Sequence, residues 1–402
     1  MPLIECVTPS LLTASVTGTS PTPISLQIPT TRFSLTELKF ALPPTTTSTK
    51  WKCPHVLDIP GVSCTCDLPH TVRCRGEADN PSSLVALTTN LARNPSNETE
   101  NVSLLDLDIH NLRNLTPGSF QKLRLLGLVI STAGLTTIPS DTFTGLETTL
   151  AALGLPSNKM TSVPNFALKP LKKLQRLDLS NNNLTVLPSR AFPTLLMLHD
   201  LNLSGNGLRL LKSEVFVGLP KLNSLNLSNN QLDSGQLNER TLWGLRMLRE
   251  LILSHNLLKG SITSTFIKGA PHLTYLNLSQ NKLTSVQRNA LEGCPKLRTL
   301  DLSKNSIEVI EDHAFHSLPD LENLNIAHNL VVAISGFSFS HMPKLEFLSL
   351  ADNALRTVTA DLIHQLPKLE NLDLAANDIT VIQKDVFNCT QNLQNLALAG
   401  KL

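Results

Sequence analysis

The residues of this sequence best suited to chemistry form one cysteine cluster. Cys53, Cys64, Cys66 and Cys74 follow one another in CPHVLDIPGVSCTCDLPHTVRC. Four cysteines can form two disulfides or bind a zinc ion. Structural zinc sites usually bring cysteines in closely spaced C-x2-C pairs, whereas this cluster reads C-x10-C-x-C-x7-C. We therefore favour disulfides, and the sequence alone does not choose among the three pairings that four cysteines allow.

Catalytic motifs are missing from the sequence. It contains no G-x-S-x-G, no glycine-rich phosphate loop and no H-E-x-x-H. Asp312, His313 and His316 are close together, but they flank Phe315, which occupies a repeated apolar position, so we interpret them as surface residues. The sequence thus predicts a protein that is not an enzyme and that uses no cofactor and no metal.

Asn-x-Ser/Thr sequons make the chain a candidate for N-glycosylation. The sequons Asn202, Asn226 and Asn277 are discounted, because N-L-S arises automatically from the repeat described next. We predict glycosylation at Asn97, Asn101, Asn114, Asn183 and Asn388.

A repeat of 24 residues organises most of the chain. Its pattern is clear in LRTLDLSKNSI, from Leu297 to Ile307, which reads L-x-x-L-x-L-x-x-N-x-I. A fixed period between 20 and 29 residues with this consensus is the leucine-rich repeat signature. The asparagines that recur in the same slot are Asn158, Asn182, Asn206, Asn230, Asn256, Asn281, Asn305, Asn329, Asn353 and Asn377.

This pattern predicts an α/β fold, a leucine-rich repeat solenoid curved like a horseshoe, with a parallel sheet on its concave side. Each L-x-L segment is a short strand that points its leucines inward, and stacked copies share one core. The asparagine stands where the chain leaves the strand. Its amide can bond backbone groups of its own and the adjacent coil, so we expect a ladder of stacked asparagines.

Composition divides the chain into three parts. Residues 1–50 are rich in Ser, Thr and Pro and are expected to be disordered. Residues 51–76 hold the cysteines and are expected to form an amino-terminal cap. Residues 77–402 are the repeat array, which starts with an irregular stretch, strand-like only around Leu84 to Leu87. The array stops inside a repeat and is expected to be truncated there, and no secretory signal is recognisable at the amino end.

The cysteine cluster followed by 24-residue repeats resembles the extracellular leucine-rich repeat family with a cysteine-rich amino-terminal flank, which includes Slit, the Nogo receptor and Toll-type ectodomains. This resemblance implies disulfides Cys53–Cys66 and Cys64–Cys74. It also implies an extracellular or cell-surface location and a protein-binding ectodomain of a receptor or adhesion protein. The alternatives are a secreted matrix protein, similar to the small leucine-rich proteoglycans, and an intracellular scaffold.

The expected partner is a protein ligand or a cell-surface receptor. A formal net charge of +2 gives no indication of nucleic-acid binding. No small-molecule substrate is indicated, and membrane attachment would need a segment that this chain does not contain.

The concave face is the default binding surface of a solenoid. Phe347 is expected to be exposed there, so that Phe347→Ala would weaken binding without unfolding the protein. Glu322, Glu346 and Glu370 occupy equivalent positions and are expected to stack into an acidic row that favours a basic partner. The predicted ligand-binding residues are Arg249, Ile252, Tyr275, Arg298, Asp301, Glu322, Glu346, Phe347 and Glu370.

Overall fold

The computed structural model describes residues 60–68, 70–78, 80–92, 102–262, 265, 267–383, 386–387, 390 and 392–400. The segment 1–50, Cys53 and the sequons Asn97, Asn101 and Asn388 lie outside the described residues. Two compact units are present. Among the described residues, the amino-terminal unit runs from Pro60 to Asn230 and includes Trp243–Leu245, and the carboxy-terminal unit holds Gln231–Leu242 and the residues from Arg246 onward.

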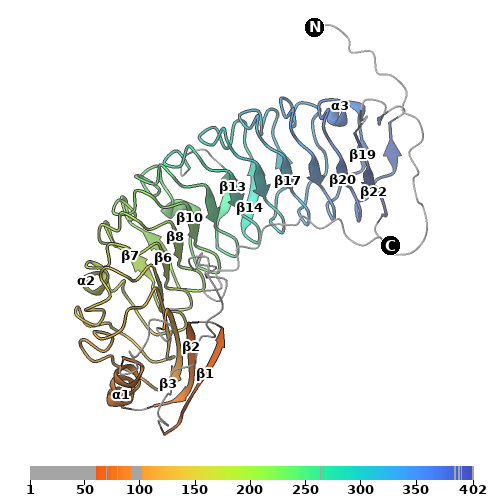
Figure 1. Ribbon diagram of the computed structural model, residues 1–402. Coiled ribbons are helices and arrows are strands. Elements are labelled where there is room, and N and C mark those ends of the chain that lie inside the picture. The colour runs from red at the N-terminus through yellow and green to blue at the C-terminus, as the bar shows by residue number, and fades with distance from the viewer. Residues whose placement is uncertain are drawn as a thin grey trace, which may run out of the picture. The chain divides into compact units, whose positions relative to one another are not determined.

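In the amino-terminal unit, a sheet of parallel strands is closed at its first edge by one antiparallel strand (Figure 1). The sheet strands, in spatial order, are β1 (Val62–Leu68), β2 (Thr71–Glu77), β3 (Leu104–His110), β4 (Gly127–Ser131), β5 (Ala152–Gly154), β6 (Arg176–Asp178), β8 (Asp200–Asn202) and β10 (Ser224–Asn226). The segments that connect them contain α1 (Pro81–Ala92), α2 (Asn165–Leu168), β7 (Val186–Leu187) and β9 (Leu210–Leu211).

The carboxy-terminal unit repeats the same coil. Its parallel strands are β11 (Glu250–Ile252), β13 (Tyr275–Asn277), β15 (Thr299–Asp301), β17 (Asn323–Asn325), β18 (Phe347–Ser349), β20 (Asn371–Asp373) and β22 (Asn395–Ala397). Its connecting segments contain η3 (Ser234–Gln236), β12 (Lys259–Ile262), β14 (Lys282–Val286), β16 (Val309–Ile310), β19 (Thr357–Val358), α3 (Ala360–Ile363) and β21 (Val381–Ile382). The predicted parallel-sheet solenoid is therefore confirmed.

Leucines fill the core in register. Leu276, Leu300 and Leu324 are paired positions on three neighbouring strands, and each is fully buried. The opposite wall of the coil is filled by phenylalanines, as in the stacked pair Phe315 and Phe339, whose ring centroids lie 5.7 Å apart. Each coil alone would expose this apolar surface, and burying it against its neighbours stabilises the stack.

The asparagines connect each coil to the one before it. Asn305 donates from Nδ2 to the carbonyl of Leu302 in its own coil (2.9 Å) and to that of Leu278 in the preceding coil (3.0 Å). Its Oδ1 accepts from the backbone N–H of Leu283 (3.1 Å). The same acceptance from the preceding coil recurs at every position of the expected ladder, from Asn158 to Asn377.

The residue just before each ladder asparagine has a left-handed backbone. The positive φ angles run through this row from Ser157 (54°) to Ala376 (55°) and include Lys304 (55°) and His328 (56°). Such φ values are unfavourable for most side chains and easiest for Gly and Asn. Asn181 (52°), Gly205 (67°) and Asn229 (54°) are therefore the residues of this row best suited to their conformation.

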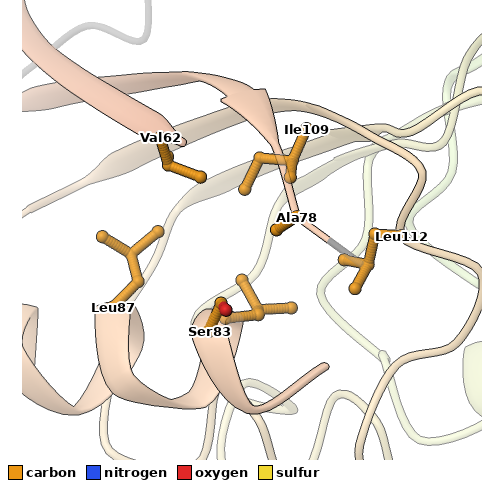
Figure 2. Close-up of a pocket in the computed structure, with 7 residues that line it drawn as sticks. Val62, Ala78, Ser83, Leu87, Ile109 and Leu112 are labelled. Carbon is orange, nitrogen blue, oxygen red and sulfur yellow. The ribbon is translucent and has the colours of Figure 1, made fainter. Parts of the chain in front are cut away.

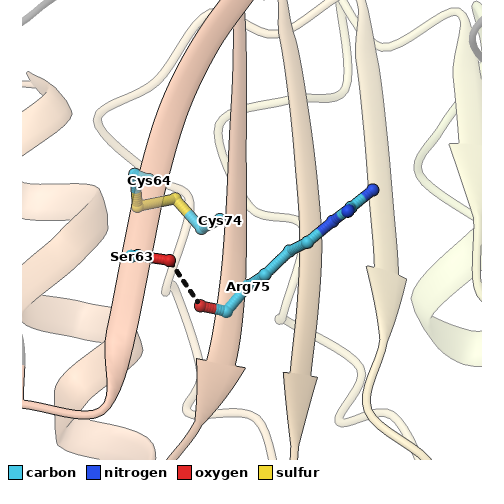
Figure 3. The surroundings of a disulfide bond; sticks show 4 residues. All are labelled: Ser63, Cys64, Cys74 and Arg75. Carbon is cyan, nitrogen blue, oxygen red and sulfur yellow. Dashed lines mark hydrogen bonds between the residues drawn. A yellow bond between two sulfur atoms is a disulfide. The ribbon is translucent and has the colours of Figure 1, made fainter.

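The cap and the first coil share one hairpin. Cys64 on β1 lies directly opposite Cys74 on β2, and the two form a disulfide (Figure 3). Ser63 Oγ donates to the carbonyl of Arg75 beside it. This confirms the Cys64–Cys74 pairing. Cys66 is also disulfide-bonded, and the implied Cys53–Cys66 pair stays a prediction because Cys53 is outside the described residues.

The expectation of an irregular stretch with a strand-like piece at Leu84 to Leu87 is wrong, because this stretch contains α1. Asn80 caps the helix by accepting from the N–H of Ser82, and Pro81 is its first residue. Leu84, Leu87 and Leu91 fall on one face at helical spacing and are buried. Figure 2 shows Leu87 facing the apolar side chains Val62 and Ile109.

We expect Asn305→Ala to lower the free energy of unfolding by about 1–3 kcal/mol, because it leaves buried backbone groups of two coils without partners. Urea denaturation followed by circular dichroism measures this change. Asn223→Ala, at a half-buried position just before β10 and outside the ladder, is the control and should shift the midpoint little. Equal midpoints for Asn305→Ala and wild type would contradict the role assigned to the ladder.

Candidate functional site

The solvent-facing side of the parallel strands is the candidate binding surface. We call it the strand face; it is the side expected to be concave. Every strand contributes side chains that alternate with buried leucines, so residues at equivalent positions lie beside one another at about 4.8 Å. In the carboxy-terminal unit these rows bring together the predicted binding residues of β11 to β20.

Basic side chains flank two of the first strands of this unit. Arg249, Arg298 and Lys304 are exposed on the coils of β11 and β15. Between them, Tyr275 and Ile252 are half-buried on paired strands. Burial raises the pKa of Tyr275 to about 12, although Asn277 Nδ2 donates to its hydroxyl at 3.4 Å. The phenol is therefore neutral at physiological pH and remains a hydrogen-bond donor.

Acidic side chains occupy the following strands. Glu322, Glu346 and Glu370 stand at equivalent positions, and the backbone N–H of each later glutamate bonds the carbonyl of the one before. At the boundary between the basic and acidic parts, Arg298 Nη1 lies 3.4 Å from Glu322 Oε1. The row of residues that immediately precede the strands thus changes from basic (Arg249, Arg298) to acidic along the direction of stacking, while Glu250 on β11 is half-buried.

Two predicted binding residues are not accessible, which corrects the expectation that they face solvent. Asp301 is 3% exposed, and its Oδ1 accepts from the N–H of Ser303 at 3.0 Å. Burial also raises the pKa of Asp301. The hydrogen bond from Ser303 holds its side chain in the turn, so that it is not presented to a partner.

Phe347 is 6% exposed, so the expectation of an exposed ring is wrong. It is paired in register with Asn323 on one side and Asn371 on the other. An aromatic ring is wider than the strand spacing and packs against the neighbouring side chains of its row. Phe347 is therefore a packing residue of the strand face.

A recurrent turn contact was missed in the sequence. The Asp or Asn between the two strand leucines accepts from the backbone N–H two residues later, which is an Asx turn. It occurs at Asp178, Asn202, Asn226, Asn277, Asp301, Asn325 and Asp373. The signal was the repeated D/N-x-S/A, which also explains why N-L-S sequons recur on the strands.

Two predicted glycosylation sites and one free cysteine lie within the described residues. The sequons Asn114 and Asn183 are exposed. Cys294 is a fully buried free thiol, as expected for a core residue, and burial raises its pKa to about 12.

Within the described part of the chain, no group of three or more His, Cys, Asp or Glu could hold a metal ion. Among the same residues, none of the helices has the length and apolarity to cross a membrane.

Stacked three-residue strands, a leucine core and an asparagine ladder define a repeat solenoid that presents one long, polar sheet face. The leucine rich repeat family model matches residues 148–208, 197–258, 260–307, 295–355 and 321–379. The chain belongs to the leucine-rich repeat family.

The chain is similar to one curated protein over a short stretch and to solved leucine-rich repeat structures over most of its length. Chaoptin of Drosophila melanogaster is 40% identical over 77 residues, which are 19% of this chain and 6% of chaoptin. Toll in the Drosophila Toll–Spätzle complex has a TM-score of 0.73 and 22% identity over 85% of this chain and 45% of its own. The mouse RP105/MD-1 complex has a TM-score of 0.60 and 25% identity over 78% of this chain and 56% of the matched chain. The chain therefore spans about half or less of each of these relatives.

We expect Phe347→Ala to destabilise the carboxy-terminal unit by about 3–5 kcal/mol, because it removes a buried aromatic side chain and leaves a cavity. The urea midpoint measures the effect. Glu346→Ala, the exposed neighbour in sequence, is the matched control and should change stability by less than about 0.5 kcal/mol. A stable Phe347→Ala protein would mean that the ring is not part of the packing.

Proposed function

We propose that this chain is the protein-binding ectodomain of a cell-surface receptor or adhesion protein, and that it binds through the strand face of the carboxy-terminal unit. The observation that carries the proposal is the ordered change of charge on that face. Exposed Arg249 and Arg298 are followed along the stack by Glu346 and Glu370. The partner is a protein with acidic and basic patches in the matching order, because complementary potentials steer encounter and fix register.

The similarity to proteins in complexes supports a protein partner. Toll and RP105 are each found bound to another protein, Spätzle and MD-1 respectively. These partners belong to the relatives. For this chain, the accessible residues of the proposed site are Arg249, Ile252, Tyr275, Arg298, Glu322, Glu346 and Glu370.

The extracellular location rests on the disulfide that joins Cys64 to Cys74. Structural disulfides persist in oxidising compartments and are rare in the cytosol. The exposed sequons Asn114 and Asn183 are compatible with passage through the secretory pathway.

The location is tested by expressing the chain in animal cells behind a supplied signal peptide and measuring its intact mass with and without glycosidase and reductant. We expect a secreted protein whose mass falls on glycosidase treatment. On reduction its mass should rise by the mass of two hydrogen atoms for each disulfide, and Cys294 should be a free thiol before and after reduction. Peptide mapping should place glycans on Asn114 and Asn183. A folded product with free cap thiols and bare sequons would favour the intracellular scaffold instead.

The binding face is tested with the triple variant Glu322→Gln, Glu346→Gln and Glu370→Gln. A tetramerised wild-type chain is used to label cell lines. A surface protein that becomes cross-linked to it is purified, and the binding of the wild-type chain and the variant to that protein is measured by titration. We expect the triple variant to bind that protein at least about tenfold more weakly and with reduced salt dependence. The control Glu239→Gln, Glu292→Gln and Glu308→Gln removes the same charge at exposed positions away from the strand face. Equal loss in both variants would contradict binding through the strand face.

A further inference from the structure

A second solvent-facing surface lies on the connecting segments of the carboxy-terminal unit. Its side chains stand one, three and four residues after a ladder asparagine on five successive coils, four of which contain β14, β16, β19 and β21. These side chains are exposed or half-buried. We call this set the flank surface; its residues follow Asn281, Asn305, Asn329, Asn353 and Asn377.

Hydrogen bonds hold these five coils in register. The backbone N–H of Leu330 donates to the carbonyl of Ile307 in the preceding coil (2.9 Å), and that of Ala354 donates to the carbonyl of Val331 (3.0 Å). The ladder bonds described above recur with the same offset from coil to coil. Residues that stand at the same distance from their ladder asparagine therefore lie beside one another on the flank surface.

The middle coil of the flank surface is apolar. Leu330 and Val332 are each 50% exposed, and Ala333 is exposed as well. Val309 of the preceding coil stands at the position equivalent to Ala333 and is 52% exposed. The segment 330–334 belongs to no strand, and it separates the small sheet of β12, β14 and β16 from that of β19 and β21. A contiguous apolar group with polar residues around it is typical of an interaction site.

Charged side chains stand on both sides of this apolar coil, with opposite signs at equal distances from it. In the row three residues after the ladder asparagine, Glu308 lies one coil before Val332 and Arg356 lies one coil after it. In the row one residue after the asparagine, Lys282 lies two coils before the apolar coil and Asp378 lies two coils after it. All four charged residues are exposed, and within the described part of the chain none of them forms an ion pair.

We propose that the flank surface binds a second copy of this chain, in a symmetric dimer whose twofold axis runs along the segment 330–333. Such an axis lies in the interface, keeps the position along a coil and reverses the order of the coils. Each coil therefore meets the coil that lies at the same distance on the other side of the centre. A second copy is the preferred occupant because the arrangement of charges makes the flank surface complementary to itself.

The twofold axis places residues of opposite charge against each other. Glu308 of one copy faces Arg356 of the other, and Lys282 faces Asp378, so that the symmetry forms each pair twice. On the axis itself, the apolar coil faces its counterpart, and side chains that are exposed in the single chain become buried. The apolar centre then supplies most of the attraction, while the charge pairs fix the register and disfavour other arrangements.

Dimerisation through the flank surface is independent of the proposed partner site. The residues of the flank surface follow the ladder asparagines, whereas the glutamates of the strand face immediately precede β17, β18 and β20. A dimer of this kind leaves both strand faces free for a partner. The variant Glu322→Gln/Glu346→Gln/Glu370→Gln should therefore dimerise as wild type does, even where it loses partner binding.

The apolar centre is tested by analytical ultracentrifugation of the full chain over a range of concentrations. We expect the mass of wild type to rise from that of one chain to that of two. Val332→Asp places like charges against each other on the axis and should raise the dissociation constant of the dimer at least about tenfold. The control Val186→Asp changes a valine that is 42% exposed in the amino-terminal unit and should leave the dimer unchanged. A wild-type chain that stays monomeric, or a Val332→Asp chain that is folded and dimerises as wild type does, would overturn the proposal.

The charge pairs are tested with the exposed substitutions Glu308→Arg and Arg356→Glu, which also carry the test if Val332→Asp fails to fold. Each variant alone sets like charges against each other and should dimerise at least about tenfold more weakly than wild type. An equimolar mixture of the two should form a heterodimer, because every base then faces an acid. The double variant Glu308→Arg/Arg356→Glu should likewise recover most of the wild-type affinity. Two folded single variants that fail to associate when mixed would overturn the twofold arrangement.

Discussion

The whole structure depends on the hydrogen bonds that asparagine side-chain amides make to the backbone of two neighbouring coils. Each sheet strand of the regular coils is three residues long, as in β15, so the ladder of main-chain bonds between coils is short. The chain must then turn away at once, which leaves carbonyl and N–H groups buried at the turn. An asparagine such as Asn329 satisfies groups in two coils at once, at Ile326 and Leu302. Because an unpaired buried group is unfavourable by about 1–3 kcal/mol, the position admits few other residues.

This constraint explains why so much of the fold could be predicted from sequence. A residue that must recur for a physical reason marks the period, and the period places every leucine. The Cys64–Cys74 pairing came from the resemblance to extracellular relatives, since spacing alone left three possibilities open. The structure adds its reason, which is that the two residues are direct cross-strand neighbours.

The failures of sequence reasoning occur where a residue's surroundings are not set by its own repeat. The helix α1 lies outside the periodic pattern, and its three leucines at helical spacing were not recognised as one face. Phe347 occupies a position that is half-buried when filled by Thr299 or Asn323, and its own size is what buries it. Asp301 was taken for a surface acid because the repeated D/N-x-S/A pattern was not recognised as an Asx turn. Membership of a row was predictable, whereas accessibility within the row was not.

The antiparallel strand β1 has a consequence for association between molecules. A stack of parallel coils is in principle open-ended, and a bare first strand would be a template on which another chain could continue the sheet. Here β2 already has β3 on one side and β1 on the other, and the pairing of β1 shifts register between Thr65 and Leu68. A further parallel coil would meet an outer strand that runs in the opposite direction and carries no asparagine ladder. The same hairpin that holds the disulfide thus prevents another parallel coil from pairing with β2.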